Sequence, residues 1–290
     1  MSETAAPARG SARAFAAVMV ANICLAFGPW LVRLADMGSE ASAFWRMTLG
    51  APLLLAATAA TRQPLPALTR PLLLTLIAAA LFFAVDLAAW HIGIHHTRIA
   101  NASLFGNITS ITFSTYGFLA ARRWPARNQT IAMLLAVAGV LLLAGRSYEL
   151  SVANLGGDLM CILAGLAYTG YLVLLERVRG RVAPLPLLAL VTIATVPMLG
   201  LFALFRGRPI LPHDWTPLVL LAIGSQLIGQ GLTIYALGEL PPVVIGLALM
   251  IQPVVGSTIG WLFYDERLTP LDLVGAVAIA AALVLVRRRE

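Results

Sequence analysis

A stripe of amide and hydroxyl side chains runs along the most polar stretch of this otherwise apolar sequence, residues 101–116. These side chains recur at spacings of +4, +3 and +4, which places them on one face of a helix: Ser103, Asn107, Ser110 and Ser114. Such groups are costly against lipid, so this face is expected to meet protein or water. Two interpretations remain open: the stripe lines a polar cavity, or it holds two helices together through small and hydroxyl residues.

A second polar stripe, Gln226, Gln230 and Thr233, has the +4 and +3 spacing within another apolar stretch. Two amides on one helix face could bind a solute in a cavity or form a hydrogen-bond network between helices. The matching stretch of the internal repeat described below contributes Asp86 and Trp90. A carboxylate, amides and hydroxyls can hold a zwitterion, and aromatic rings can stack on its side chain. These residue types therefore favour a small amphipathic solute.

Asp86 is the only acidic residue that the sequence places well inside an apolar stretch. At about 1.5 Å per helical residue, it falls in the outer third of the bilayer. An ionisable residue inside a membrane is by default a functional candidate, which could bind an ammonium group of the substrate or carry a proton. The alternative is a structural role, as the partner of His91, Arg98 or a backbone group.

Aromatic and amide side chains in two further apolar stretches complete the candidate site. Asn22 and Trp30 lie in the first stretch, and Tyr168 and Tyr171 lie in the sixth. Trp30 lies near a helix end, where it could equally anchor the helix at the membrane surface, whereas the deeper tyrosines are expected to form cavity walls. Ser257 matches Ser114 in the repeat. The expected substrate-binding set is Asn22, Trp30, Asp86, Trp90, Ser103, Asn107, Ser110, Tyr168, Tyr171, Gln226, Gln230, Thr233 and Ser257.

No arrangement of nucleophile, base or metal ligands accompanies these residues. The chain lacks HExxH, GxSxG, a glycine-rich phosphate loop and an EF-hand loop, which argues against an enzyme and against an ATP-driven pump. His91, His95 and His96 have no carboxylate or cysteine nearby at the spacing of metal ligands, so they are expected to be solvated loop histidines. Cys24 and Cys161 are expected to be small buried side chains without a disulfide. No catalytic residue, metal or cofactor is expected.

Membrane-spanning helices are the elements that must position these side chains. Hydrophobic residues make up 60% and charged residues 11% of the 290 residues, and the mean hydropathy is +0.87. A soluble domain carries about 25% charged residues. Backbone groups in hydrocarbon must be bonded internally, and stretches of about 20 apolar residues fit helices rather than barrel strands. We predict an all-α membrane protein with ten transmembrane helices, at 14–34, 41–61, 71–92, 98–120, 129–145, 157–176, 184–205, 216–237, 241–262 and 271–286.

The arginines predict the orientation of the chain in the membrane. All twenty basic residues are Arg, and with a cytoplasmic N-terminus thirteen of them fall on the inner side and six on the outer side. This positive-inside bias predicts an inner-membrane, multi-pass protein with both termini cytoplasmic and an external link at 146–156. The net charge of +7 therefore reflects topology. No basic helix with interleaved aromatics lies outside the spans, so nucleic acid is not an expected partner.

The sequence also repeats itself. Residues 96–143 align without a gap with residues 239–286 at a shift of 143, which pairs Gly117 with Gly260. Each copy has five spans, and five is odd, so the second copy enters the bilayer from the opposite side. The expected organisation is a disordered cytoplasmic segment 1–13, a first repeat 14–145, the external link and a second repeat 157–290. In inverted-repeat transporters the substrate site lies near the midplane between the halves, in helices that are often interrupted. Pro253 in the ninth span is expected to bend its helix.

A known family resembles this pattern. Residues 260–275, GWLFYDERLTPLDLVG, and Phe44-Trp45-Arg46 resemble the EamA-type transporters of the drug/metabolite transporter superfamily. The resemblance covers essentially the whole chain and is strongest to the YddG-type exporters of aromatic amino acids. It implies ten helices, cytoplasmic termini, a central cavity and efflux without ATP. The first copy departs from the family, because residues 122–125 read RRWP where Glu-Arg-Leu is common, so Glu266 is interpreted as structural.

The sequence therefore predicts a secondary transporter that exports small metabolites, aromatic or apolar amino acids first, by alternating access through a central cavity. Its expected partners are an amino-acid-like small molecule and the lipid bilayer, and it is expected to function as a monomer. One alternative is an exporter of broad drug or metabolite specificity. A membrane enzyme or a channel is the alternative from a different class, although a channel would favour charged rings that the sequence does not show.

Overall fold

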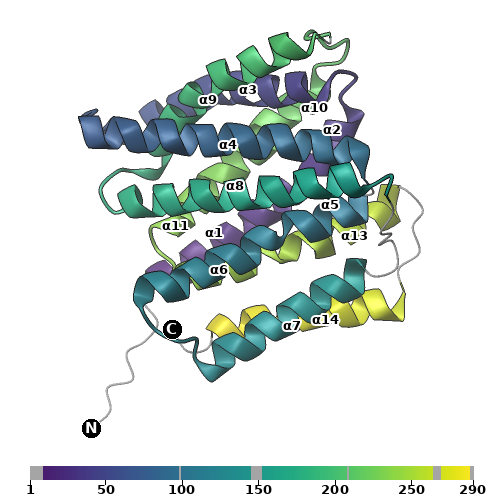
Figure 1. The fold of residues 1–290 in the computed structure, drawn as a ribbon. Helices are drawn as coiled ribbons and strands as arrows, with labels where there is room; N and C mark the ends of the chain where they lie inside the picture. Colours follow the sequence, from purple (N-terminus) through teal and green to yellow (C-terminus); the bar gives the residue numbers. More distant parts are fainter. Residues whose placement is uncertain (1–8, 98, 145–151, 208, 264–268, 288–290) are drawn as a thin grey trace.

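Helices make up all the regular structure of the computed structural model, which describes residues 9–97, 99–144, 152–207, 209–263 and 269–287 (Figure 1). The elements are α1 (Arg9–Ala26), α2 (Gly28–Leu34), α3 (Ser39–Ala60), α4 (Arg70–His96), α5 (Ile99–Gly106), α6 (Ile108–Ala121), α7 (Arg127–Ala144), α8 (Leu155–Arg179), α9 (Pro184–Arg206), α10 (Thr216–Leu220), the π-helix η1 (Leu221–Gln230), α11 (Gly231–Leu237), α12 (Pro242–Leu249), α13 (Ile251–Phe263) and α14 (Pro270–Arg287). Proline lies in the first turn of α2, α4, α9, α10 and α12. Its missing N–H would have no intrahelical partner there.

Seven helical stretches of the described chain are long and apolar enough to cross a membrane: Ala12–Leu34, Ser39–Ala60, Arg70–His96, Leu155–Arg179, Pro184–Arg206, Thr216–Leu237 and Pro242–Phe263. Two shorter apolar helices, Arg127–Leu143 and Pro270–Val286, lie at the fifth and tenth expected spans. The fourth expected span is divided into α5 and α6. Helical structure thus occurs at every expected position. The prediction of a disordered segment 1–13 is wrong for its last part, because α1 begins at Arg9.

Two helices break at equivalent points of the repeat. The fourth span is interrupted at Asn107 and the ninth at Met250, positions that the shift of 143 superposes. Both residues have nearly the same backbone angles, φ −69° and ψ −2° at Asn107 and φ −70° and ψ −3° at Met250. Pro253 explains the second break, because proline removes one bond of the helical ladder and clashes with the preceding turn. The expected bend is therefore confirmed.

Equivalent helices of the two halves pack against each other. Two such pairs are α3 with α9 and α7 with α14. The fourth and ninth spans pack through α6 and α12, although the shift of 143 aligns α12 with α5. In addition, α4 packs along α8 as α1 packs along η1 and α11. At the α7–α14 contact, a Cβ on Gly139 would lie 2.6 Å from the Gly275 carbonyl oxygen, and a Cβ on Gly275 would lie 2.7 Å from that of Gly139. Gly139 also approaches Ile279, and Gly275 approaches Leu143. Contact positions rise along one helix as they fall along the other, so α7 and α14 run antiparallel. Figure 1 shows this pair as a layer at one side of the bundle.

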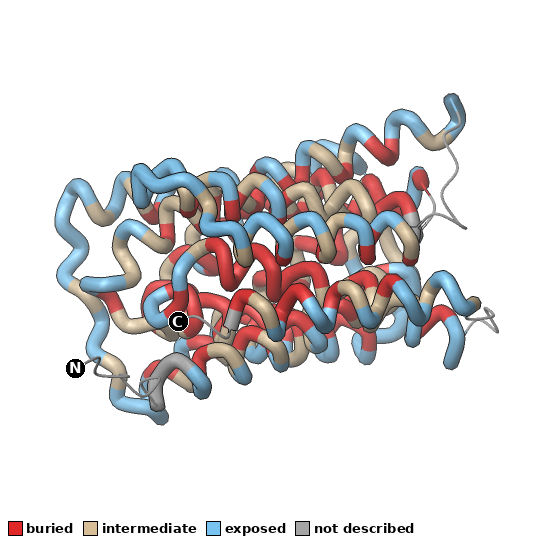
Figure 2. Tube along the Cα trace, turned by 90° about the horizontal axis from the view of Figure 1, so that it is seen from below, coloured by how far each residue is buried: buried red, intermediate tan, exposed pale blue. Residues whose placement is uncertain are grey.

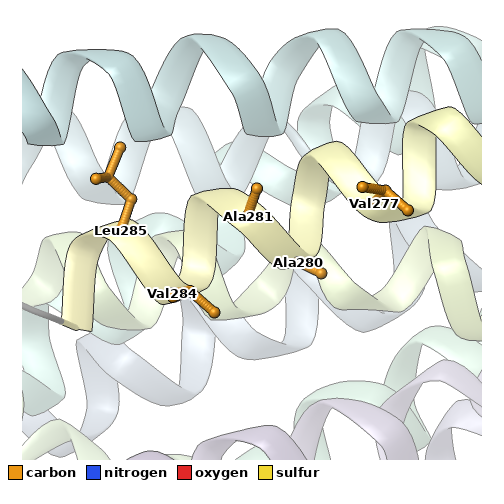
Figure 3. A pocket seen from close by; sticks show the side chains of 5 residues that line it. All are labelled: Val277, Ala280, Ala281, Val284 and Leu285. Atoms are coloured by element: carbon orange, nitrogen blue, oxygen red, sulfur yellow. The ribbon is translucent and has the colours of Figure 1, made fainter.

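Buried residues fill the middle of the bundle, and exposed ones cover its outside (Figure 2). Many exposed side chains are large and apolar, such as Leu119, Leu134 and Leu201, as expected for a surface that meets lipid. The groove on α14 in Figure 3 belongs to this outer surface, because only Val277, Ala280, Ala281, Val284 and Leu285 line it. It offers a polar solute no hydrogen-bonding side chain.

Candidate substrate-binding site

An aromatic and amide cluster lies in the middle of the bundle. Tyr168 and Tyr171, three residues apart on α8, both direct their hydroxyls to Gln230 at the end of η1. The Gln230 amide donates to the Tyr168 hydroxyl at 3.1 Å, and the Tyr171 hydroxyl donates to Gln230 Oε1 at 3.5 Å. The Tyr171 ring stacks on Tyr168 and on Phe83 of α4, at centroid distances of 5.6 and 4.4 Å. The cluster therefore joins side chains from both halves of the chain.

Arg46 of α3 and Asp86 of α4 bring opposite charges to this cluster. Arg46 is 3% exposed, and its charge acts on Asp86, Tyr168 and Tyr171. Its Nε is enclosed without a hydrogen-bond partner. Asp86 is half-buried, and no hydrogen bond joins its carboxylate to another described residue. Between the described residues, no Arg46 nitrogen lies within 4.0 Å of an Asp86 oxygen. The two charges influence each other electrostatically without forming an ion pair.

Gln226 lies one turn before Gln230 on η1 and is completely buried. Its Nε2 donates to Thr192 Oγ1 of α9 at 2.9 Å, whereas its Oε1 has no partner. Its side-chain stem lies against Gly50, where a Cβ would come within 2.7 Å of Gln226 Cγ. Gly50 and Arg46 share one face of α3, since four residues separate them. This face therefore carries both Arg46 and the glycine that admits Gln226.

Asn22, Trp30 and Trp90 lie around the helix breaks. Asn22 Oδ1 accepts from Gln252 of α13 at 2.8 Å, and its amide donates to the Val18 carbonyl in its own helix. Trp30 stacks on Phe263 with a centroid distance of 4.8 Å. The Trp90 ring approaches Gly28, where a Cβ would lie 3.1 Å away. The contacts of Asn22 and Trp30 join α1 and α2 to the second half of the chain, and the contact of Trp90 joins α4 to α2.

The residues of the serine stripe do not share one environment in the structure. A Cβ on Gly246 of α12 would collide with the Ser114 hydroxyl and lie 2.7 Å from the Ser110 carbonyl oxygen. Ser110 is buried, with its hydroxyl directed to Asn107 Oδ1 at 3.4 Å. Here the geometry supports the helix-packing alternative. Thr233 likewise bonds the Gly229 carbonyl in the preceding turn. Ser257 is half-buried, and the Ser103 side chain lies outside the described part of the structure.

The histidine prediction is partly wrong. His91 is fully buried. Its Nδ1 lies 2.7 Å from the Ser42 hydroxyl and 3.1 Å from the Ser39 carbonyl oxygen. His95 and His96 are exposed, as expected. His91 is therefore not the partner of Asp86, and Arg98 lies outside the described residues. No group of three metal-ligating side chains was found in the described ranges.

Sequence reasoning missed Arg46 as a candidate for the site, although the signal was present. An Arg inside an apolar span must meet a carboxylate or a water-filled space, and Asp86 was the carboxylate available. It also missed two buried carboxylates near helix ends. Asp158 accepts from Thr97 and Asn101, and Glu40 accepts from Arg206 at 2.7 Å. Asp158 and Glu40 Oε1 thus have protein donors, as the Asp86 carboxylate does not, although Glu40 Oε2 is enclosed without a partner.

Comparison with known proteins identifies the family of membrane proteins to which this helical fold belongs. The model of the EamA-like transporter family matches twice, at residues 12–145 and 155–288, and the chain belongs to this family. Among curated proteins, the threonine/homoserine exporters RhtA of Escherichia coli K12 and O157:H7 are 28% identical over 151 residues. That match covers 52% of this chain, and the chain spans about half (51%) of the length of these relatives. A crystal structure of another protein shares the fold, with a TM-score of 0.79, 15% identity and coverage of 96% of this chain and 97% of that one.

Proposed function

We propose that this protein is an inner-membrane secondary transporter that exports amino acids through the central site. The observation that carries the proposal is the polar cluster of Arg46, Asp86, Tyr168, Tyr171 and Gln230, surrounded by the apolar core of an EamA-family bundle. Charged groups at such a place are expensive to maintain, and in transporters they mark the path of the solute. The described residues also lack an open row of charges that would favour a channel.

Ten spans in two inverted repeats, 14–145 and 157–290, form the proposed topology. Three observations support it: the double match of the family model, the equivalent breaks at Asn107 and Met250, and the antiparallel packing of α7 on α14. Helices related by a repeat of unchanged orientation would run parallel, so antiparallel packing favours inversion. The arginine bias favours cytoplasmic termini. The signature residue Glu266 and most of the 146–156 link lie outside the described residues.

The burial pattern favours alternating access. Val243–Leu249 of α12 are all buried, whereas Ile251, Gln252 and Ser257 of α13 are half-buried. The bundle is thus tighter at the end where α12 begins, which is the cytoplasmic end in the proposed orientation. This arrangement suits a carrier whose site communicates with the outer side while the inner side is closed. Export requires a second arrangement with the opposite opening.

Two cargo classes remain under this proposal. The stacked rings of Phe83, Tyr168 and Tyr171 favour aromatic or apolar amino acids, which can contact an apolar wall. The similarity to threonine/homoserine exporters favours threonine-like cargo. Both share the same zwitterionic backbone.

Counterflow in proteoliposomes tests the proposal. Vesicles preloaded with unlabelled L-phenylalanine or L-threonine should accumulate the same labelled amino acid, and Gln230→Leu should lower the rate by about tenfold or more, since it removes the partner of two buried hydroxyls. Gln63→Leu is a matched control, because Gln63 caps the backbone N–H of Leu185 in a loop. Absence of counterflow with both amino acids in correctly folded protein would contradict amino-acid export.

A further inference from the structure

The central charges form an incomplete pair. The ion pair between described residues is Glu40 with Arg206, at 2.7 Å, so the fold brings opposite charges into contact where it needs a structural bond. Arg46 and Asp86 act on each other across the site but lie beyond 4.0 Å. A buried charge without a partner is strongly destabilising, whereas an apolar replacement would avoid that cost. The gap therefore needs an explanation.

Arg46 is positioned to donate. Its stem and Nε are enclosed, while its two terminal nitrogens are not among the enclosed atoms that lack partners. No hydrogen bond joins these nitrogens to a described residue, so they retain some exposed surface at which a ligand could bind. A guanidinium presents parallel N–H groups that match the two oxygens of a carboxylate, which makes Arg the residue best suited to bind one. The Tyr168 and Tyr171 hydroxyls lie within the reach of the same charge.

Asp86 is positioned to accept. It is half-buried in the middle of α4, between Phe83 on one side and Trp90 on the other along the helix, and no described residue donates to it. Gln226 adds Oε1, an enclosed acceptor without a partner, against the face of α3 that carries Arg46. A cationic ligand group with several N–H donors would pair with the partly exposed Asp86 carboxylate. The site thus offers donors and acceptors separately, each lacking its complement.

We propose that Arg46 and Asp86 form a charge clamp for the two ionised ends of an α-amino acid, with the carboxylate on Arg46 and the ammonium on Asp86. The proposal rests on the proposed function and specifies its recognition chemistry. A ligand with both charges completes both half-pairs at once, whereas a ligand with one charge leaves the other residue unpaired. The clamp binds the ammonium and carboxylate groups that all α-amino acids share, and the aromatic rings then contact the side chain of the ligand.

Binding to the purified, full-length protein in detergent tests the clamp. Labelled L-phenylalanine is displaced by unlabelled L-phenylalanine, by 3-phenylpropionate, which lacks the ammonium, and by 2-phenylethylamine, which lacks the carboxylate. Each analogue should bind at least about tenfold more weakly than L-phenylalanine, because each loses a charge-assisted interaction. Labelled L-threonine serves as the second probe. This comparison needs no variant, so misfolding cannot obscure it.

Two variants assign each end of the ligand. Asp86→Asn should abolish the preference for L-phenylalanine over 3-phenylpropionate, and Arg46→Gln should abolish the preference over 2-phenylethylamine. Each result is a ratio within one protein preparation and does not depend on the amount of folded material. Asp158→Asn and Arg206→Gln are the controls, because these buried or paired charges already have protein partners. Both controls should retain the parental ratios.

The outcomes separate the clamp from the function. If labelled L-phenylalanine and L-threonine neither bind nor undergo counterflow, the proposal of amino-acid export fails and the clamp fails with it. If they bind and are transported but the singly charged analogues compete equally well, export stands and the clamp is overturned. Parental ratios in both Asp86→Asn and Arg46→Gln would also overturn it, leaving a purely structural charge pair.

Discussion

Asp86 can hold a proton or an ammonium group, but not both at once. If it binds the substrate, lowering the pH should weaken amino-acid binding, because a protonated carboxyl no longer attracts the ammonium. The charged and titratable groups around it are Arg46, Tyr168, Tyr171 and, through Arg46, His91. Binding of L-threonine should therefore be measured between about pH 5 and pH 7, where the charges of the amino acid itself stay constant.

Asp86→Asn should bind weakly at every pH in this range and lose the pH dependence. His91→Gln is the control, because His91 titrates in this range in its unperturbed state and lies near the site. A pH dependence that survives in Asp86→Asn and disappears in His91→Gln would assign the effect to the histidine instead.

Residue spacing identified some of these side chains because it fixes which helix face they share. The stripe of Gln226 and Gln230, and the pair Tyr168 and Tyr171, were found in this way. Spacing does not fix the rotation of a helix about its axis relative to its neighbours. The spacing therefore left open whether Ser110 lines a cavity or packs two helices together, and in the structure its carbonyl oxygen lies close to Gly246 of α12. Pairing Arg46 with Asp86 required knowledge that α3 and α4 are neighbours in space.

Helix interruptions are likewise only partly predictable from the sequence. The break at Met250 follows from Pro253, which the sequence displays. No proline predicts the break at Asn107, and none predicts the π-helical stretch η1. Repeat symmetry could have located the first of these, because Asn107 occupies the position equivalent to Met250. The π-helix depends on packing against α1 and α3, which lies beyond any local sequence signal.

Close packing of α7 on α14 leads to a prediction of stability. Gly139→Ala should lower the thermal unfolding temperature in detergent, because the new methyl group meets the Gly275 carbonyl oxygen, a backbone atom that no rotamer change can move. Overpacking costs about 1–3 kcal/mol, which offsets or exceeds the gain of about 1 kcal/mol in helix propensity.

Gly256→Ala is the matched control for Gly139→Ala. It makes the same exchange within a helix, at a position where a Cβ would meet nothing within 4 Å. Its unfolding temperature should stay constant or rise slightly through helix propensity. Equal or higher stability of Gly139→Ala relative to Gly256→Ala would mean that the two helices separate readily and that this contact does not hold the layer.

The architecture of the whole molecule was the most predictable level, because the bilayer restricts a spanning chain to helices and the apolar stretches are long. The internal match at a shift of 143 also predicted two repeats, and the family model matches the chain twice. The spans predicted at 129–145 and 271–286 were the shortest of the ten, and α7 and α14 are indeed the shorter apolar helices. Orientation is different again, because it depends on charges in loops and on the membrane rather than on packing.

Orientation therefore needs a labelling experiment on the whole protein. In a background with Cys24→Ala and Cys161→Ala, Val152→Cys should react with an impermeant thiol reagent added to intact cells, because the positive-inside bias places the link between the halves outside. Val152 is 91% exposed, so the thiol would be accessible; the neighbouring Ser151, equally suited by sequence, lies outside the described residues. Leu65→Cys, in a loop on the opposite side and 64% exposed, should react only after permeabilisation. The reverse pattern would invert the proposed topology, and with it the direction in which the tighter α12 end of the bundle faces. Reaction of both positions from outside would instead mean that an even number of helices crosses the membrane between them. One of the three predicted spans in this interval would then not cross, and the short helix α7 would be the first candidate.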